Sequence, residues 1–231
     1  MTHTYEYPHP SVTVDCVVFG LSAEGAGLGV LLIRRKDDPF AGRLALPGGF
    51  VEIDEDLEDA AARELKEETG AEVQHLEQLY TFGKPGRDPR ERVISVSYFA
   101  LVRSGDHAVK GGSDASEAVW VPLADAFGME LAFDHYKILT MAYERLKAKL
   151  LYEPLCFDLL PEKFTFAQVQ DVYEAVLQVR FDKRNFRRQF YRLDILVEAG
   201  WQEGVSHRPG ALYSFDRGAF VPGGFQIQGG A

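Results

Sequence analysis

The sequence predicts an α/β protein in which an α/β/α sandwich, residues 1–150, precedes a small winged helix-turn-helix domain, residues 151–231. Two observations predict this organisation. Apolar, β-branched runs alternate with helical segments over the first part, as in a sheet with helices on its faces. After residue 154 the expected order becomes helix, turn, basic helix and β-hairpin, which is the order of a winged helix-turn-helix.

The first part holds the strands of the predicted sandwich. Apolar runs rich in β-branched residues are expected to form strands at 11–19, 29–34, 93–101 and 118–121. A helix is expected from Phe133 to about Leu150, with Asp134 as its N-cap. Its predicted apolar stripe comprises Tyr136, Leu139, Tyr143, Leu146 and Leu150.

The second part has clear helix-start signals. Thr165 and Gln168 have the spacing of a capping box, and apolar residues then recur at helical period as far as Leu177. Asp182 is expected to cap a second helix with an apolar face of Phe186, Phe190 and Leu193. Two short strands, 201–205 and 212–215, are expected to follow, and the last segment, VPGGFQIQGGA, is expected to be a loose tail.

The charge of the chain is unevenly distributed. The net charge is −10, which argues against general attraction to nucleic acid or to an anionic membrane. Residues 1–150 hold 16 Lys and Arg against 25 Asp and Glu, whereas residues 151–231 hold 9 against 10. Any binding to nucleic acid is therefore expected to be local and to involve the second part.

Neither the cysteines nor the N-terminus indicates export. Cys16 and Cys156 lie in apolar surroundings without metal-ligand or redox spacing, so they are expected to be reduced core residues. The N-terminal segment lacks a basic region followed by an apolar one, and no apolar run approaches membrane-spanning length. We expect a cytoplasmic protein without membrane segments.

A motif between Gly49 and Gly70 carries the strongest chemical signal. Gly49 is followed after five residues by Glu55 and after seven more by Arg63-Glu64-Leu65-Lys66-Glu67-Glu68. At helical spacing Glu64, Glu67 and Glu68 share one face, and clustered carboxylates suit Mg²⁺ or Mn²⁺. Mg²⁺ often shares its ligand shell with phosphates, which predicts a diphosphate ligand. Gly48 and Gly49 permit a tight loop ahead of the helix.

A solvent-facing acidic helix would also place acids at these spacings, but it would not place the glycines and Arg63 in register with them. The arrangement resembles the Nudix box, the metal and diphosphate site of the Nudix superfamily. Ala71 departs from it, because the family usually has a larger aliphatic residue there. This departure affects packing and not chemistry. The resemblance implies metal binding by Glu64, Glu67 and Glu68, with Arg63 as a further catalytic residue.

The second helix of the C-terminal part is basic. Residues 180–192 carry six Lys and Arg and one Asp. A charged helix face is usually only solvated, yet this one occurs in an acidic chain and in a helix-turn-helix order. Such side chains reach phosphates and base edges from the major groove. The residues expected to contact DNA are Lys183, Arg184, Asn185, Arg187, Arg188 and Arg192.

Further motifs resemble the NrtR family, Nudix-related transcriptional regulators with a C-terminal winged helix. They are the segments 79–83 (LYTFG), 87–90 (RDPR) with Arg92, 131–135 (LAFDH), 159–161 (LLP) and 182–188 (DKRNFRR). The resemblance implies a homodimer that binds ADP-ribose or a related phosphosugar and presents two winged helices to a palindromic operator. Relatives control genes of NAD biosynthesis, and others control sugar catabolism.

Two functions remain open at this point. The first is a DNA-binding regulator that senses ADP-ribose, with Gly48, Gly49, Arg87, Arg90 and Arg92 contacting the ligand. The second is a Mg²⁺-dependent pyrophosphatase that hydrolyses ADP-ribose to AMP and ribose 5-phosphate, because the box is intact where many NrtR members have a degraded one. Slow hydrolysis could also end the signal in a regulator. Glu117 is a candidate base outside the box, and His135 is expected to be structural or exposed and not a metal ligand.

Overall fold

A computed structural model describes residues 6–21, 27–71, 73, 75–103, 117–206 and 208–227. The sheet of the first part contains β1 (Ser11–Leu21), β2 (Leu28–Arg34), β3 (Leu44–Ala45), β4 (Gly48–Phe50), β5 (His75–Phe82), β6 (Val93–Val102) and β7 (Ala118–Pro122). The main order is β3-β2-β1-β6-β5, with β4 paired to β1 and β7 paired to β2. Only β1 and β6 run parallel among these pairs. The four expected strands are confirmed.

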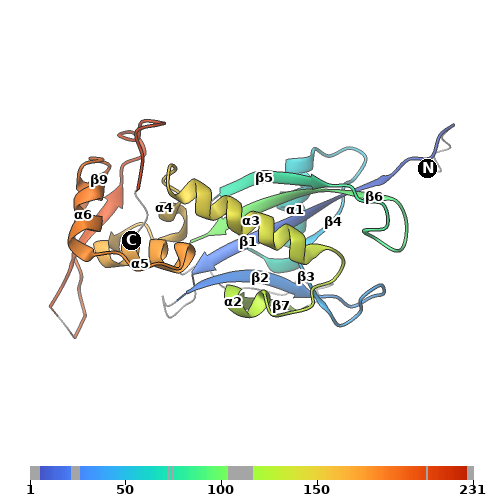
Figure 1. Ribbon diagram of the computed structural model, residues 1–231, viewed down its shortest axis with the longest axis horizontal. Coiled ribbons are helices and arrows are strands. Elements are labelled where there is room, and N and C mark those ends of the chain that lie inside the picture. Colours follow the sequence, from blue (N-terminus) through green and yellow to red (C-terminus); the bar gives the residue numbers. More distant parts are fainter. Residues whose placement is uncertain are drawn as a thin grey trace.

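Two helices cover opposite faces of this sheet: α1 (Leu57–Thr69) lies behind it and α3 (His135–Leu150) lies in front of it (Figure 1). The side chains of β1 alternate accordingly. Val14, Cys16 and Val18 pack in the cluster that includes α1 residues, whereas Val17 and Phe19 pack in the cluster that includes α3 residues. Both faces of β1 are therefore buried, which explains the unbroken apolar run at residues 16–19. The α/β/α sandwich is confirmed; the short helix α2 (Leu123–Ala126) follows β7.

Helix α3 differs from its prediction in two details. Asp134 occupies the N-cap position, but its carboxylate makes no capping hydrogen bond and is bound by Arg87 instead. Tyr136 is 46% exposed and does not belong to the buried stripe. The buried face starts at His135 and continues through Ile138 and Leu139, so the stripe lies one position earlier in the first turn than the sequence suggested.

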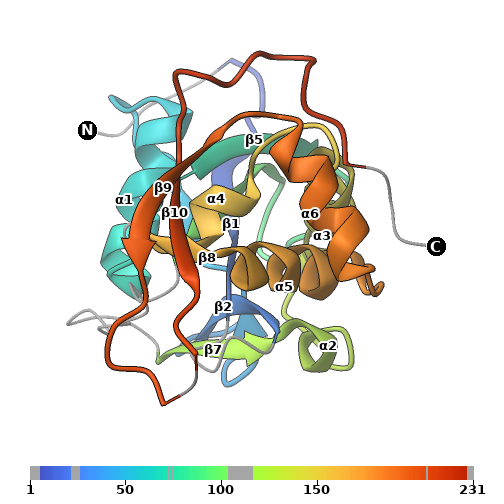
Figure 2. The same cartoon turned by 90° about the vertical axis from the view of Figure 1, so that its left-hand side faces the viewer.

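The second part consists of α4 (Cys156–Leu159), β8 (Phe164–Thr165), α5 (Phe166–Leu177), α6 (Lys183–Tyr191), β9 (Leu196–Trp201) and β10 (Ala211–Phe215). The strands form an antiparallel sheet in the order β8-β10-β9 beside the two helices (Figure 2). The capping box of α5 is confirmed, because Thr165 Oγ1 accepts from Gln168 N and the Gln168 side chain accepts from Thr165 N. Asp182 caps α6 by accepting from Asn185 N at 2.9 Å.

Two predictions for the end of the chain are wrong. The first strand of the hairpin ends at Trp201, whereas the sequence suggested that it begins there. The expected loose tail is packed at two of its apolar residues, since Phe225 and Ile227 are only 1% and 4% exposed, and its last four residues, 228–231, lie outside the described ranges. Ile227 N also donates a hydrogen bond to Leu151 O at 2.9 Å. This segment therefore returns to the junction between the two parts.

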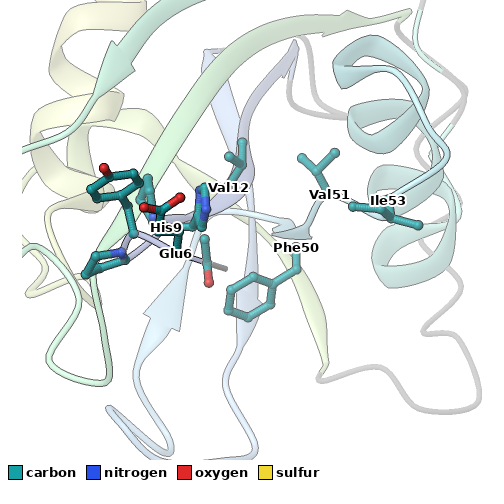
Figure 3. A pocket seen from close by; sticks show the side chains of 10 residues that line it. Glu6, His9, Val12, Phe50, Val51 and Ile53 are labelled. Carbon is teal, nitrogen blue, oxygen red and sulfur yellow. The ribbon is translucent and has the colours of Figure 1, made fainter. Parts of the chain in front are cut away.

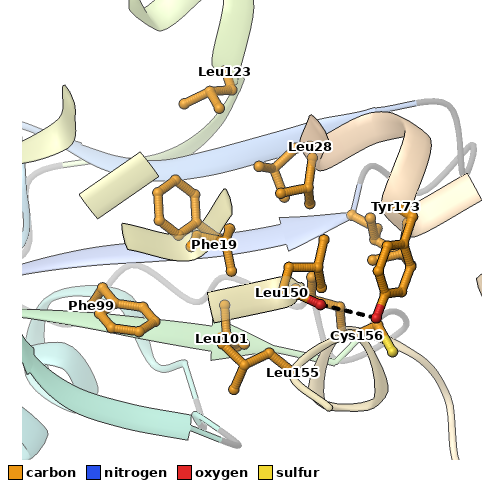
Figure 4. Close-up of a cluster of buried hydrophobic side chains, with 14 of the residues drawn as sticks. Phe19, Leu28, Phe99, Leu101, Leu123, Leu150, Leu155, Cys156 and Tyr173 are labelled. Atoms are coloured by element: carbon orange, nitrogen blue, oxygen red, sulfur yellow. Dashed lines mark hydrogen bonds between the residues drawn. The ribbon is translucent and has the colours of Figure 1, made fainter. Parts of the chain in front are cut away.

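One hydrophobic core runs through both parts of the molecule. A single cluster of buried residues includes Phe19 and Phe99 of the sandwich and Tyr173 and Phe190 of the winged helix. Tyr173 reaches across the junction and donates its hydroxyl hydrogen to Leu150 O at 3.0 Å (Figure 4). Cys16 and Cys156 are both buried and unbridged, as expected. No helix within the described ranges is long and apolar enough to cross a membrane.

Candidate functional site

The Nudix-box residues meet where β4 leads into α1. A Cβ atom at Gly48 would lie 2.1 Å from Val14 O, and one at Gly49 would lie 2.3 Å from Glu64 Oε1. Gly48 has no room for a side chain against the backbone of β1, and a side chain at Gly49 would displace the Glu64 carboxylate. Because the backbone approaches so closely, Gly48 N donates to Glu68 Oε2 at 2.8 Å. Helix α1 is fixed behind this loop by the buried residues Ala60, Ala61 and Leu65.

Arg63 is the centre of an ion-pair network on α1. Its guanidinium group contacts Glu55 at 2.6 Å, Glu64 at 2.8 Å and Glu67 at 3.4 Å, and it also donates to Phe50 O at 3.1 Å. The hydrogen bond from Arg63 lowers the pKa of Glu55 to about 2, with help from the Glu52 amide. Arg63 thus holds the loop against the helix and orients two of the three expected metal ligands.

Glu68 has different surroundings. Burial, together with the negative charges of Glu64 and Asp15, raises its pKa to about 7 against the opposing effect of the Gly48 hydrogen bond. Burial also raises the pKa of Glu64. Acidic groups that resist ionisation because of like charges are those that gain most from a nearby cation.

The donor chemistry of the box fits a divalent cation, but its arrangement is not that of a formed metal site. Carboxylate oxygens are the ligands that Mg²⁺ and Mn²⁺ prefer. Yet among the residues that the structure describes, no group of three or more His, Cys, Asp or Glu side chains could hold a metal ion. The physical reason is visible in the contacts: Glu64 and Glu67 face Arg63, whereas Glu68 faces Gly48. Metal binding by all three requires Glu67, which is 61% exposed, to turn inward.

A cavity of about 180 Å³ opens beside Gly48 and Gly49. Its walls combine charged and aromatic side chains from β1, β2, the loop before β6 and the start of α3. The residues that line it include Asp15, Arg35, Phe50, Arg87, Asp88, Arg90, Phe133 and His135. Polar groups converging on a hollow beside a carboxylate-rich helix are typical of a ligand site.

Arg87 forms part of the cavity floor and is nearly enclosed, with 4% of its side chain exposed. It pairs with Asp134 at 2.7 Å and with Asp15 at 3.1 Å. Asp15 also accepts a hydrogen bond from Ser95 Oγ at 2.5 Å. Because its side chain is enclosed between two carboxylates and only 4% exposed, Arg87 organises the site and has little left to offer a ligand. The sequence grouped it with Arg90 and Arg92 as a ligand-gripping residue.

His135 fixes the opposite side of the floor. Its Nδ1 accepts a hydrogen bond from Leu46 N at 2.9 Å, and its Nε2 lies 3.5 Å from Asp15 Oδ1. Because Nδ1 accepts from a backbone N–H, it carries no proton, and the network assigns the proton of a neutral ring to Nε2. Burial lowers the pKa of His135, which agrees with this assignment. The expectation of a structural histidine agrees with these contacts, although the residue also lines the cavity.

Arg90 and Arg35 are the accessible cations of the cavity. Arg90 pairs with Asp88 at 2.7 Å, yet 42% of its side chain is exposed. The two guanidinium groups lie over the Phe133 ring, at 4.8 Å for Arg35 and 5.7 Å for Arg90. Burial and the neighbouring charge of Arg90 lower the pKa of Arg35. Two cations held this close favour an anionic ligand.

The sequence reasoning missed Arg35, Asp15 and Phe133, and two of its candidate residues do not line the cavity. Arg92 is exposed and does not line the cavity. Glu117 pairs with Arg34 at 3.6 Å, is 77% exposed and is also absent from the cavity lining. Arg35 directly follows β2. A charged residue at the end of this buried strand was the signal that could have identified it.

A larger hollow of about 670 Å³ adjoins this cavity and shares Phe50 with it. The N-terminal segment, with Glu6, His9 and Val12, forms one side, and Val51 and Ile53 form the other (Figure 3). Ile53 is 79% exposed and Phe50 is 44% exposed. This surface offers apolar contacts next to the charged cavity.

The cationic surface of the second part lies on α6. Its six expected DNA-binding residues are all exposed, while Phe186 and Phe190 are fully buried. Arg184 and Arg188 have no partner among the described residues, whereas Arg187 is bound to tyrosine hydroxyls. The helix thus has an apolar face that anchors it and a cationic face that is available to a partner.

These features define a Nudix protein with a C-terminal winged helix. Residues 9–141 match the NUDIX domain family, and residues 156–215 match the NrtR DNA-binding winged helix domain. The chain therefore belongs to the NrtR family. It is similar to the ADPR responsive transcriptional repressor NtrR of Acinetobacter baylyi, with 37% identity over 91% of this chain and 84% of the relative.

Two further relatives match. The crystal structure of Shewanella oneidensis NrtR complexed with a 27mer DNA superimposes with a TM-score of 0.80 at 34% identity, covering 94% of this chain and 97% of that one. The ADP-ribose pyrophosphatase of Methanocaldococcus jannaschii is 43% identical over 58% of this chain and 73% of its own length. The first likeness spans both parts, and the second spans the Nudix domain.

Proposed function

We propose that this protein is a transcriptional regulator that binds operator DNA through α6 and senses ADP-ribose, or a closely related nucleoside-diphosphate sugar, through its Nudix domain. The observation that carries the proposal is the joining of an exposed cationic helix to a charged ligand cavity in one chain of net charge −10. The similarity to an ADPR responsive repressor over 91% of the chain supports it. We further propose that it acts in the cytoplasm as a homodimer on genes of NAD metabolism.

The cavity supports a ligand of this class. Arg35 and Arg90 provide the guanidinium groups for a diphosphate, since charge-assisted hydrogen bonds to phosphate are strong. The cavity is smaller than the ~300 Å³ at which typical ligand pockets begin. A nucleoside-diphosphate sugar would therefore extend past Phe50 into the adjoining hollow, where its base would meet apolar surface.

The proposed function as a transcriptional regulator is tested with DNA and ligand together. The protein is used to enrich binding duplexes from a random-sequence library, and binding to the enriched duplex is then measured by anisotropy with and without ADP-ribose. We expect one palindromic sequence to be enriched, and its affinity to change at least tenfold with ADP-ribose. If no sequence is enriched over a scrambled duplex, the protein is not a sequence-specific regulator.

The ligand contacts are tested by substitution in the cavity. Arg90→Ala and Arg35→Ala should each weaken ADP-ribose binding by roughly tenfold or more in calorimetry, because each removes a charge-assisted hydrogen bond of ~1.5–3 kcal/mol. Arg92→Ala is the matched control and should bind normally. If Arg92→Ala weakens binding and Arg90→Ala does not, the ligand lies outside the cavity.

A second candidate function is hydrolysis of ADP-ribose to AMP and ribose 5-phosphate. The intact box and the 43% identity to an ADP-ribose pyrophosphatase favour it.

We propose Mg²⁺ or Mn²⁺ as the cofactor, held by Glu64, Glu67 and Glu68. A bound divalent cation would neutralise charge that develops on the diphosphate. Arg63 orients Glu64, and the Gly48–Gly49 backbone brings Glu68 to the edge of the cavity. Glu117 does not line the cavity, and we propose a box glutamate as the proton acceptor.

The hydrolytic proposal is tested by following AMP release with Mg²⁺ present. Glu68→Gln should slow the reaction by on the order of a hundredfold, as the loss of a charge-stabilising group does elsewhere. Lys66→Gln, on the same helix, is the control and should retain activity. Wild-type protein that releases no AMP on prolonged incubation would exclude hydrolysis and leave the sensing function intact.

A further inference from the structure

Arg187 is held in a fixed position on α6 by two tyrosines. Its Nε and Nη2 donate to Tyr191 Oη at 2.9 and 2.6 Å, and Nη2 also reaches Tyr213 Oη at 3.3 Å. The two tyrosine hydroxyls are themselves hydrogen-bonded at 3.0 Å. Three side chains are thus joined by four hydrogen bonds, although Arg187 and Tyr191 lie on the exposed surface.

Aromatic rings complete the enclosure. The guanidinium carbon lies 5.2 Å from the centroid of the Tyr191 ring and 5.5 Å from that of Phe166, and these two rings stack at 6.0 Å. We call Arg187, Phe166, Tyr191 and Tyr213 the arginine clamp. Its members come from α6, from the first turn of α5 and from β10 of the small sheet, so the clamp joins three elements of the winged helix.

The clamp leaves Arg187 with a restricted set of donors. A guanidinium group has five N–H bonds, of which Nε carries one and each Nη carries two. Nε and both hydrogens of Nη2 face the tyrosine hydroxyls, so only Nη1 is free to bind a partner. Reading a guanine needs two nitrogens that donate to O6 and N7 together. One phosphate oxygen, in contrast, accepts from a single nitrogen.

Arg184 and Arg188 lie one turn apart on the exposed face of the same helix. No hydrogen bond, ion pair or ring contact fixes either guanidinium group within the part of the chain that the structure describes. Both can therefore present the two-nitrogen edge that base recognition requires.

We propose that Arg187 is a pre-positioned phosphate contact, held by Tyr191 and Tyr213, and that base recognition falls to Arg184 and Arg188. The proposal rests on the DNA-binding function proposed above and divides its residues by role. Tyr213 is a positioning residue, because it is 5% exposed and acts through Arg187. Holding the guanidinium group in place before DNA arrives reduces the side-chain entropy lost on binding.

The test uses the duplex enriched by the wild-type protein, together with every single-base-pair variant of it. Arg187→Ala should weaken binding to all of these duplexes by the same factor, on the order of tenfold, and lower the salt slope by about one per protomer. Arg188→Ala should instead reduce discrimination at one base pair per half-site by roughly tenfold. Arg34→Ala, in the Nudix domain, is the control for loss of an exposed arginine.

Tyr213→Phe tests the positioning role. It keeps the charge and the ring, so the salt slope should not change, while affinity should fall by about three- to fivefold through the loss of an ordered donor. Arg187→Lys should retain the salt slope without restoring affinity, since an ammonium group cannot make the fork to Tyr191. Tyr80→Phe, which keeps its ring contact with Phe82, is the matched control. Circular dichroism at the assay temperature establishes that each variant is folded.

The outcomes separate this inference from the function on which it rests. If the wild type enriches a duplex but Arg187→Ala relaxes the preference at a single base pair, Arg187 reads a base and the inference is wrong. Equal affinities of Tyr213→Phe and Tyr80→Phe would also overturn it, since the clamp would then be only structural. If no duplex is enriched at all, the DNA-binding function itself fails and the inference falls with it.

Discussion

Arg87 and Arg90 belong to one loop but have opposite surroundings. Arg87 is enclosed between the carboxylates of Asp15 and Asp134, whereas Arg90 pairs only with its neighbour Asp88 and remains 42% exposed. The partners of Arg87 lie 72 and 47 residues away in the chain. Local sequence therefore identifies a run of arginines in this loop but cannot say which of them forms buried ion pairs in the fold. The box residues were predictable because their partners lie within the same helix and loop.

We expect Arg87→Ala to destabilise the protein by about 3–5 kcal/mol, because removing one partner leaves two buried carboxylates uncompensated. Urea denaturation followed by circular dichroism measures this change. Arg90→Ala is the control and should cost under about 1 kcal/mol, since an exposed ion pair contributes little. Equal and small effects of the two substitutions would show that Arg87 is not the anchor of the cavity floor.

The raised pKa of Glu68 predicts that stability falls as pH rises. Below its unfolded-state value of about 4.5 both states are protonated and no cost arises. Between there and about pH 7 the unfolded state ionises while the folded state does not, so the free energy of unfolding falls by roughly 3 kcal/mol, a loss that is complete above pH 7. Glu68→Gln should reduce this dependence; a smaller part, from the raised pKa of Glu64, should remain. Urea midpoints in EDTA at about pH 5 and pH 8 provide the measurement, with the exposed Glu67→Gln as the control that should keep it.

At the scale of elements, the sequence was most informative where capping residues and periodicity agree. The start of α5 was predicted at the correct residue, because both sides of its capping box lie within four positions. The first strand of the hairpin was predicted at the wrong residues, because β9 is half-exposed and lacks strict alternation of buried and exposed positions. Trp201, the predicted first residue of this strand, is its last residue and is 66% exposed. β8 is only two residues long and is defined by its pairing to β10, which local sequence does not reveal.

The capping box of α5 should contribute measurably to stability. Thr165→Ala removes the Oγ1 that accepts from Gln168 N, and we expect it to cost about 1 kcal/mol. Thr165→Ser retains the oxygen and should restore most of that loss. Thermal or urea unfolding of the three proteins measures the difference. If the serine variant is as unstable as the alanine variant, the threonine methyl group, and not the cap, stabilises the helix.

At the scale of the whole molecule, the two parts are joined by more than a linker. The core cluster is continuous from β1 to α6, and the C-terminal segment adds Phe225 and Ile227 to it. Tyr143 also donates to Val176 O at 2.8 Å, from α3 to α5. Helix α3 begins at the ligand cavity with His135 and ends at this junction with Leu150, which contacts Tyr173. The segment with Phe225 and Ile227 follows two glycines and therefore resembles a loose tail in sequence. Only the fold shows the surface on which these two residues pack.

A continuous core predicts that the Nudix domain and the winged helix unfold together. The chain has two tryptophans, Trp120 in β7 and Trp201 in β9, so each part carries its own reporter. Trp201→Phe leaves Trp120 as the reporter of the Nudix domain, and Trp120→Phe leaves Trp201 as the reporter of the winged helix. We expect the denaturation midpoints of the two variants, measured by tryptophan anisotropy, to differ only by the effect of each substitution on stability. Circular dichroism of each variant supplies that correction, because a two-state protein gives coincident curves by every probe.

ADP-ribose should then shift the Trp201 curve as far as the Trp120 curve, since a ligand stabilises the whole cooperative unit. If the winged helix unfolds before the Nudix domain, or if ADP-ribose does not shift the Trp201 midpoint, the junction does not couple the two domains.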